Sequence, residues 1–175
     1  MATTAMCKQL ISMEPTKKKL SEEQAYTHLA RLCSQTEYCR HDLRRKMQAW
    51  ELPDGCEDRI LAKLEQERFL DETRYAHAFA RDKFRYNRWG SQRIALELTL
   101  RGIDADTVAD ALTEITEEDS DATLEQLLRK KLQTVKAKSD YDLFLKLLRY
   151  SVGRGYPKEQ AHRCLRRIIN SEEGE

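Results

Sequence analysis

The stretch FLDETRYAHAFARDKFRYNRWGSQRIALELTLRGID, residues 69–104, is the most informative part of this sequence for the fold. Two of its segments have the apolar spacing of amphipathic helices, and Trp89-Gly90 stands between them. Asp71 can begin the first helix, because its side chain can accept a free backbone N–H. Gly102 can end the second, because glycine readily adopts the left-handed turn that closes many helices. The stretch therefore predicts two helices joined by a tight turn.

Apolar and aromatic side chains of this stretch recur at helical spacing and predict the core of one module. Tyr75 and Phe79 are one helical turn apart, as are Ile94 and Leu98. We expect Trp89 to pin the turn to this core rather than to stack on a nucleic-acid base. The residues expected to define the module are Leu70, Asp71, Tyr75, Phe79, Trp89, Gly90, Ile94, Leu98 and Gly102.

The Arg-Gly-apolar end of this stretch recurs elsewhere in the chain. LRGIDADTVADAL, residues 100–112, matches GRGYPKEQAHRCL, residues 153–165. MQAWELPDGCEDRILAKL, residues 47–64, matches both if three residues are inserted. Equivalent apolar positions are about 50 residues apart, a period typical of a supersecondary unit used serially. We predict an elongated all-α fold of three tandem three-helix repeats, at 21–68, 69–118 and 119–170.

The chain ends and further helix starts can also be predicted. Residues 1–19 lack periodicity and are expected to form a flexible arm, and residues 171–175 form an acidic tail. Ser and Asp side chains can cap a helix, and Pro fits its first turn. The predicted starts are Ser21, which forms a capping box with Gln24, Asp104, Ser139 and Pro157.

The composition favours helices and a reducing environment. Only three of the 175 residues are proline and six are glycine, too few turn residues for an all-β protein. The five cysteines include no CxxC pair, and a site of Cys33, Cys39, His41 and Cys56 would lack the close ligand pairs of structural zinc. No apolar segment approaches the roughly 20 residues that span a bilayer. We expect a cytoplasmic protein without metal, cofactor or membrane contact.

The sequence contains no recognisable catalytic motif. It has no P-loop, dinucleotide-binding fingerprint, nucleophile elbow or HExxH zinc motif. The four histidines are spread over different repeats: His28, His41, His77 and His162. His77 lies in the apolar run YAHAFA and is better explained as a structural or solvent-facing residue than as a base. We predict that the protein is not an enzyme.

Charge is segregated along the chain, although the formal net charge is only +1. There is no Lys or Arg from Ile103 to Leu128, whereas basic residues alternate with aromatic ones before that segment. Two basic surfaces one repeat apart would suit a long polyanionic or acidic partner, and no set of side chains stands out as reading bases. The candidate partner-binding residues are Arg81, Lys83, Arg85, Arg88, Arg93, Arg101, Lys146, Arg149, Arg154 and Arg163.

The central stretch resembles the RecX family, bacterial regulators of the RecA recombinase. The matching residues are Phe69-Leu70-Asp71-Glu72, Arg74-Tyr75-Ala76, Phe79, Arg81, Trp89-Gly90, Arg93-Ile94, Glu97-Leu98 and Arg101-Gly102-Ile103. The resemblance implies a curved monomer that binds within the groove of the RecA filament on single-stranded DNA. It also implies inhibition of ATP hydrolysis, strand exchange and co-protease activity, with weak and non-specific contact to the single-stranded DNA itself.

Two features depart from that family pattern. In the first repeat Glu51 replaces the turn glycine and Pro53-Asp54-Gly55 is inserted, and residues 104–125 are acidic. The residues alone leave two other functions open. One is a helical scaffold that binds acidic proteins. The other is a helix-turn-helix regulator of duplex DNA, which the acid-rich third helices disfavour.

Overall fold

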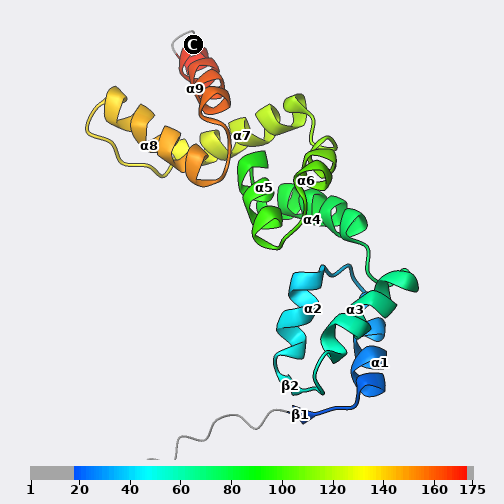
Figure 1. Cartoon of the computed structure of the whole chain (residues 1–175). Helices are drawn as coiled ribbons and strands as arrows, with labels where there is room; N and C mark the ends of the chain where they lie inside the picture. The colour runs from blue at the N-terminus through cyan, green and yellow to red at the C-terminus, as the bar shows by residue number, and fades with distance from the viewer. Residues whose placement is uncertain (1–17, 173–175) are drawn as a thin grey trace, which may run out of the picture.

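The computed structural model describes residues 18–172, which are predominantly helical (Figure 1). The described helices are α1 (Glu22–Cys33), α2 (Arg40–Met47), α3 (Cys56–Gln66), α4 (Glu72–Asn87), α5 (Ser91–Leu100), α6 (Ala105–Leu112), α7 (Glu117–Leu132), α8 (Asp140–Gly153) and α9 (Lys158–Glu172). Two short strands, β1 (Lys18–Lys19) and β2 (Trp50–Glu51), pair in parallel. The predicted all-α fold is confirmed. Residues 1–17 of the predicted arm and 173–175 of the predicted acidic tail lie outside the described residues.

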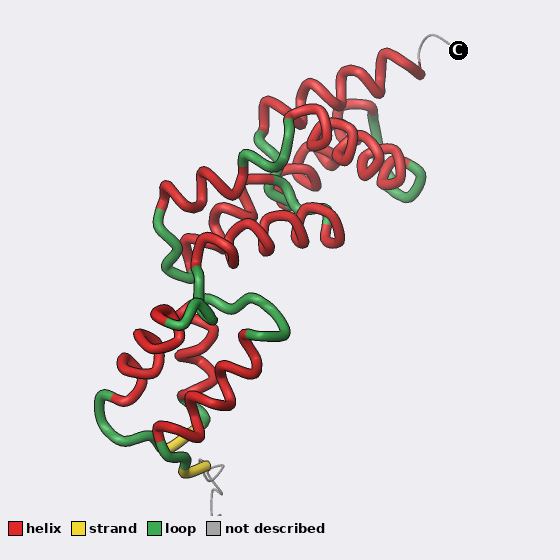
Figure 2. Tube along the Cα trace, turned by 90° about the vertical axis from the view of Figure 1, so that its right-hand side faces the viewer, coloured by secondary structure: helices red, strands yellow, loops and turns green. Residues whose placement is uncertain are grey.

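The helices pack in three successive groups, each around its own core. Leu29 is buried among α1–α3, Leu98 among α4–α6 and Leu165 among α7–α9. The groups follow one another along an elongated, bent molecule (Figures 1 and 2). We propose that each group is one repeat, and we refer to the groups as repeats 1, 2 and 3. The expected bounds 21–68, 69–118 and 119–170 agree with this grouping except that repeat 3 begins with α7 at Glu117 and its last helix ends at Glu172.

Side-chain capping explains where most of these helices begin. The predicted starts at Asp71, Asp104 and Ser139 are confirmed, since each side chain accepts the N–H of the residue three positions later. Ser21 and Gln24 form the predicted capping box of α1. α7 begins in the same way at Thr116, a start that the sequence analysis missed. Each such cap is worth about 1 kcal/mol.

The second helix of repeat 1 is capped by repeat 2 instead of by its own residues. Cys39, the N-cap residue of α2, makes no side-chain cap. The carboxylate of Glu72 in α4 accepts the N–H of Arg40 at 3.4 Å. An N–H at a helix start has no partner inside the helix, so Glu72 supplies an acceptor that repeat 1 lacks.

The second helix of repeat 2 is capped by repeat 3 in a corresponding way. Gly90, the N-cap residue of α5, has no side chain to offer. The carbonyl oxygens of Arg154 and Gly155 accept the N–H groups of Gly90 and Gln92 at 2.9 and 3.0 Å. α8, which no further repeat follows in the described residues, has its own cap at Ser139. Helix capping therefore connects each repeat to the next.

The contact between repeats 2 and 3, which we call joint 2–3, leaves no room for side chains at its centre. A Cβ atom on Gly90 would collide with the carbonyl group of Gly155, and one on Gly155 would collide with Arg93. Beside the glycines, the hydroxyl of the buried Tyr156 donates to the carbonyl oxygen of Arg88 at 3.3 Å. The two turns are therefore packed backbone against backbone.

The start of repeat 1 differs from the sequence prediction of an unstructured arm that extends to residue 19. Lys18–Lys19 forms β1, and its pairing with Trp50–Glu51 includes a bond from the N–H of Leu20 to the carbonyl of Glu51 at 3.4 Å. In repeats 2 and 3 the corresponding turn closes on a left-handed glycine. In repeat 1 this turn has no preceding repeat in the described residues, and β1 covers it instead. The left-handed glycine of this longer turn is Gly55, directly before α3, so Glu51 is instead part of the short strand pair.

Replacing Gly90 by Ala should lower the free energy of unfolding by about 1–3 kcal/mol, the usual cost of overpacking. The φ of Gly90 is −77°, so the loss would come from the collision with repeat 3 and not from backbone strain. Gly153→Ala is the matched control, because an added Cβ there meets open space at the end of α8. It should be neutral or stabilising by less than about 1 kcal/mol. Urea unfolding of both variants checks this, and equal effects would refute the backbone contact.

Candidate partner-binding surface

A row of alternating cations and aromatic rings lies on repeat 2. The rings of Phe79 and Trp89 meet edge to face, with centroids 6.4 Å apart. Lys83 Nζ lies over both rings, at 5.1 and 5.3 Å from their centroids. The guanidinium of Arg93 lies 4.0 Å from the Trp89 centroid, and that of Arg101 lies 4.9 Å from the Phe79 centroid. Each contact is worth about 0.5–1 kcal/mol at an exposed site.

Two of the candidate partner-binding residues, Arg93 and Arg101, are half-buried against these rings. Arg101 also donates to the carboxylate and the backbone carbonyl of Glu97, both at 2.6 Å, and its Nε is buried without a hydrogen-bond partner. The rings of Phe79 and Trp89 therefore hold the protein's own cations and are poorly placed to stack on bases.

Other cations of repeat 2 are free. Arg81 and Arg85 are exposed one turn apart on α4, and Arg88 is exposed at its C-cap. Within residues 18–172 none of the three has an ion-pair partner. Tyr86, with 81% of its surface exposed, lies among them. We call Arg81, Arg85 and Arg88 the α4 stripe. These three guanidinium groups can bind an external anion without first breaking an internal ion pair.

The predicted cations of repeat 3 are mostly occupied. Lys146 pairs with Asp142 at 2.7 Å, and Arg163 pairs with Glu117. Arg154 Nη1 donates to the carbonyl oxygen of Asn87 at 2.8 Å, across joint 2–3. Only Arg149 among the four candidates is exposed and lacks an ion-pair partner in the described part of the chain. The second basic surface is therefore weaker than the sequence suggested.

The acidic block that follows residue 103 is largely used inside the protein. Asp121 is buried on α7, where its carboxylate accepts from the amide of Gln160 at 2.8 Å and pairs with Arg167 at 3.1 Å. Glu125 pairs with Arg167 as well, at 3.1 Å. α7 and α9 are thus joined by ion pairs. The acidic residues of α7 and the basic residues of α9 are separated in the sequence by α8 but meet in the fold.

His77 connects α4 to α6 through the remaining acids of that block. Its Nδ1 lies 2.8 Å from a carboxylate oxygen of Glu114 and its Nε2 lies 3.0 Å from one of Asp110. An ionised carboxylate can only accept, so both ring nitrogens must donate and the imidazole is charged. The hydrogen bond to Glu114, followed by that to Asp110, raises the pKa of His77 above its usual 6.5. His77 is a structural residue in this arrangement.

The four cysteines in the described residues show no reactive or metal-binding arrangement. Cys33, Cys39, Cys56 and Cys164 are buried free thiols. Burial raises the pKa of Cys164 to about 12, which keeps this thiol protonated and poorly nucleophilic. Within the described residues, no three side chains of metal-binding type come together. None of the helices in that part of the chain combines the length and apolar character needed to cross a membrane.

Comparison with known proteins supports the fold and the central repeat. The family model of the second three-helix domain of RecX matches residues 71–112, which contain the cation–aromatic row. The regulatory protein RecX of Clostridium perfringens strain SM101 is 26% identical over 168 residues, which cover 93% of this chain and 78% of the relative.

Two solved structures share the fold of this chain. A crystal structure of regulatory protein RecX superposes with a TM-score of 0.74 at 20% identity, over 81% of this chain and 70% of that one. RecX from Lactobacillus salivarius gives a TM-score of 0.73 at 18% identity, over 85% of this chain and 96% of that one. The chain therefore shares its all-α fold with these RecX structures and is similar in sequence to RecX proteins over most of its length, and its residues 71–112 match the second three-helix domain of RecX.

The His77 contacts should make stability depend on pH. A group whose pKa is raised by folding contributes fully below its unfolded pKa, near 6.5, and its contribution is lost as pH rises through the folded value. The free energy of unfolding should therefore fall between pH 6.5 and mildly alkaline pH in the native protein, and less so in His77→Gln. Urea unfolding of both proteins across that range measures the difference. Parallel pH profiles would contradict the charged bridge.

Arg88 should be replaceable by glycine with a gain in stability. Its φ of 55° lies in the left-handed region, which costs a residue with a Cβ roughly 1–2 kcal/mol. After the extra chain entropy of glycine is subtracted, Arg88→Gly should stabilise the protein by about 0.5–1 kcal/mol. Arg85→Gly, inside α4, should instead destabilise by about 1 kcal/mol. Chemical unfolding separates the two, and a loss of stability in both would show that the Arg88 side chain supports the fold.

Proposed function

We propose that this protein is a non-catalytic, cytoplasmic regulator that binds the RecA filament on single-stranded DNA. By occupying the filament it would lower ATP hydrolysis, strand exchange and co-protease activity in recombination and DNA repair. Similarity to RecX proteins supports the class of function, because these relatives are named regulatory protein RecX. The observation that carries the proposal is the α4 stripe, a set of exposed and unpaired cations on the repeat that matches the family model.

The geometry of the stripe suits a surface of phosphates or carboxylates. Arg81 and Arg85 follow one face of α4, and Arg88 continues it toward repeat 3. Such contacts are independent of base sequence and weaken as salt rises. The protein's own cations cover the rings of Phe79 and Trp89, so stacking of bases on these rings would contribute little to binding. The proposed contact is electrostatic and does not read sequence.

The candidate residues divide into three roles under this proposal. The α4 stripe and Arg149 would contact the partner directly. Three further candidates would stabilise the shape of this surface, because each packs against an aromatic ring: Lys83, Arg93 and Arg101. The remaining candidates support joint 2–3 or the core of repeat 3: Lys146, Arg154 and Arg163.

The proposal is tested by RecA ATP hydrolysis on single-stranded DNA, with this protein added well below the RecA concentration. The native protein should inhibit. Arg81→Glu with Arg85→Glu should raise the concentration for half inhibition by at least about tenfold, which corresponds to roughly 1.4 kcal/mol. Arg31→Glu with Arg45→Glu is the matched control, because it makes the same charge change at two exposed, unpaired arginines of repeat 1. The control should change inhibition by less than about twofold.

Two results would decide against the proposal. Absence of inhibition at any ratio would exclude a RecA regulator. A pull-down in which RecA binds equally well with and without DNA would favour the alternative, a helical scaffold for acidic protein partners. A monomer that binds the filament through its cations should instead require the assembled nucleoprotein and should dissociate at high salt.

A further inference from the structure

The two joints between repeats are built from different kinds of interaction. In joint 2–3, backbone groups bind backbone groups, and Gly90 and Gly155 leave no space between them. In the contact between repeats 1 and 2, which we call joint 1–2, the N–H groups of Phe69 and Leu70 donate to the carbonyl oxygen of Leu64 beside the chain connection, and the other described polar contacts involve a side chain. The Arg74 guanidinium forms a two-pronged pair with the Glu37 carboxylate, at 2.8 and 3.2 Å. The Tyr75 hydroxyl donates to Asp42 at 3.1 Å.

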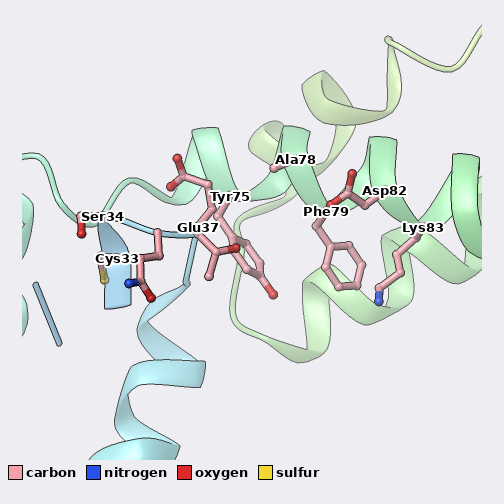
Figure 3. A pocket seen from close by; sticks show the side chains of 10 residues that line it. Cys33, Ser34, Glu37, Tyr75, Ala78, Phe79, Asp82 and Lys83 are labelled. Atoms are coloured by element: carbon pink, nitrogen blue, oxygen red, sulfur yellow. The ribbon is translucent and has the colours of Figure 1, made fainter. Parts of the chain in front are cut away.

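A cleft of about 430 Å³ lies beside joint 1–2. Another, of about 300 Å³, lies beside joint 2–3 between Ser91 and Gln160, but there the two turns stay in backbone contact. Figure 3 shows Cys33, Ser34 and Glu37 of repeat 1 facing Phe79 and Lys83 of α4 across the cleft beside joint 1–2. The facing surfaces of repeats 1 and 2 are therefore not in full contact around this cleft.

One buried residue of repeat 1 connects the repeats on the other side of the cleft. Cys39, at the end of the α1–α2 turn, has no exposed surface and belongs to the core of repeat 2. In the opposite direction, Leu70 of the α3–α4 connection is buried in the core of repeat 1. Both residues lie in segments between helices, where they fix the point of contact but not the angle between the repeats. The described polar contacts away from the chain connection involve side chains.

Arg74 is the side chain that holds the present angle. Besides its pair with Glu37, it donates to the carbonyl oxygen of Arg68 at 3.2 and 3.3 Å. Arg68 lies in the connection between α3 and α4 and has a left-handed φ of 61°. Arg74 therefore ties the α1–α2 turn and the α3–α4 connection together. Its side chain is 46% exposed, so salt can screen the ion pair.

We propose that repeat 1 is hinged at Cys39 on a rigid unit formed by repeats 2 and 3, and that Arg74 latches the hinge in the conformation seen here. Hinges in proteins are often a few residues in loops and at helix ends, such as those that join repeats 1 and 2. Opening of the latch would change the curvature of the molecule while each three-helix core stays intact. The proposal does not depend on the identity of the partner.

The test is a pair of distance distributions from electron–electron double resonance. Spin labels are attached through introduced non-natural amino acids, which leaves the native cysteines unmodified. One pair, Ala62 and Lys130, spans repeats 1 and 3, and the other, Leu96 and Lys130, spans repeats 2 and 3. All three positions are exposed. The Arg74→Gln variant opens the latch. The control is Arg59→Gln, which removes an equally forked pair with Glu22 inside repeat 1.

In Arg74→Gln, the distribution between positions 62 and 130 should become at least about twofold wider, while that between 96 and 130 stays unchanged. Arg59→Gln should change neither, and 1 M salt should act on the native protein as Arg74→Gln does. If circular dichroism shows that Arg74→Gln has lost helical structure, the effect of salt on the native protein tests the hinge in its place. A 62–130 distribution that stays narrow in both cases, or equal broadening of both pairs, would overturn the hinge.

Discussion

The contact between the turn at Trp89-Gly90 and the turn at Arg154-Gly155 is the constraint on which the rest of the structure depends. α5 begins without a cap of its own, so its first N–H groups need acceptors from elsewhere, and the carbonyl oxygens of repeat 3 supply them. Because these acceptors are backbone atoms, the two turns must approach more closely than any side chain allows, which requires glycine at both positions. Repeat 2 is thus completed by repeat 3. The same logic, with the Glu72 side chain as the acceptor, completes repeat 1.

Much of the fold could be predicted from the sequence because its signals are local. Side-chain caps such as Asp71 and Ser139 act over three residues, and the apolar spacing of Ile94 and Leu98 needs only one helix. The capping of α5 by repeat 3 joins residues more than 60 positions apart, and no sequence pattern near Gly90 predicts it. β1 was missed for the same reason, since the two-residue strand exists only through its pairing with Trp50–Glu51.

The sequence predicts which residues form the candidate surface but not which of their charges are already paired inside the protein. Sequence identifies which residues are cationic, whereas the three-dimensional arrangement decides which are already paired. Arg101 and Arg163 are used by carboxylates from their own or a neighbouring helix, and Arg93 by the ring of Trp89. Within the described residues the α4 stripe has no ion-pair partner, although Asp82 is exposed beside it on α4, whereas Glu114 binds His77 and Glu125 of α7 pairs with Arg167 of α9. Folding therefore pairs many charges of a nearly neutral chain internally and leaves other cations exposed, among them the α4 stripe.

The central claim is that repeat 3 caps α5 and so makes repeats 2 and 3 a single unit. The most direct measurement is native-state hydrogen exchange of the Gly90 and Gln92 amides in the full chain, followed by NMR. Capped by the carbonyl oxygens of Arg154 and Gly155, these two amides should exchange as slowly as the core amide of Leu98, although they lie at a helix start. Exchange as fast as that of an exposed, frayed helix end would contradict the account.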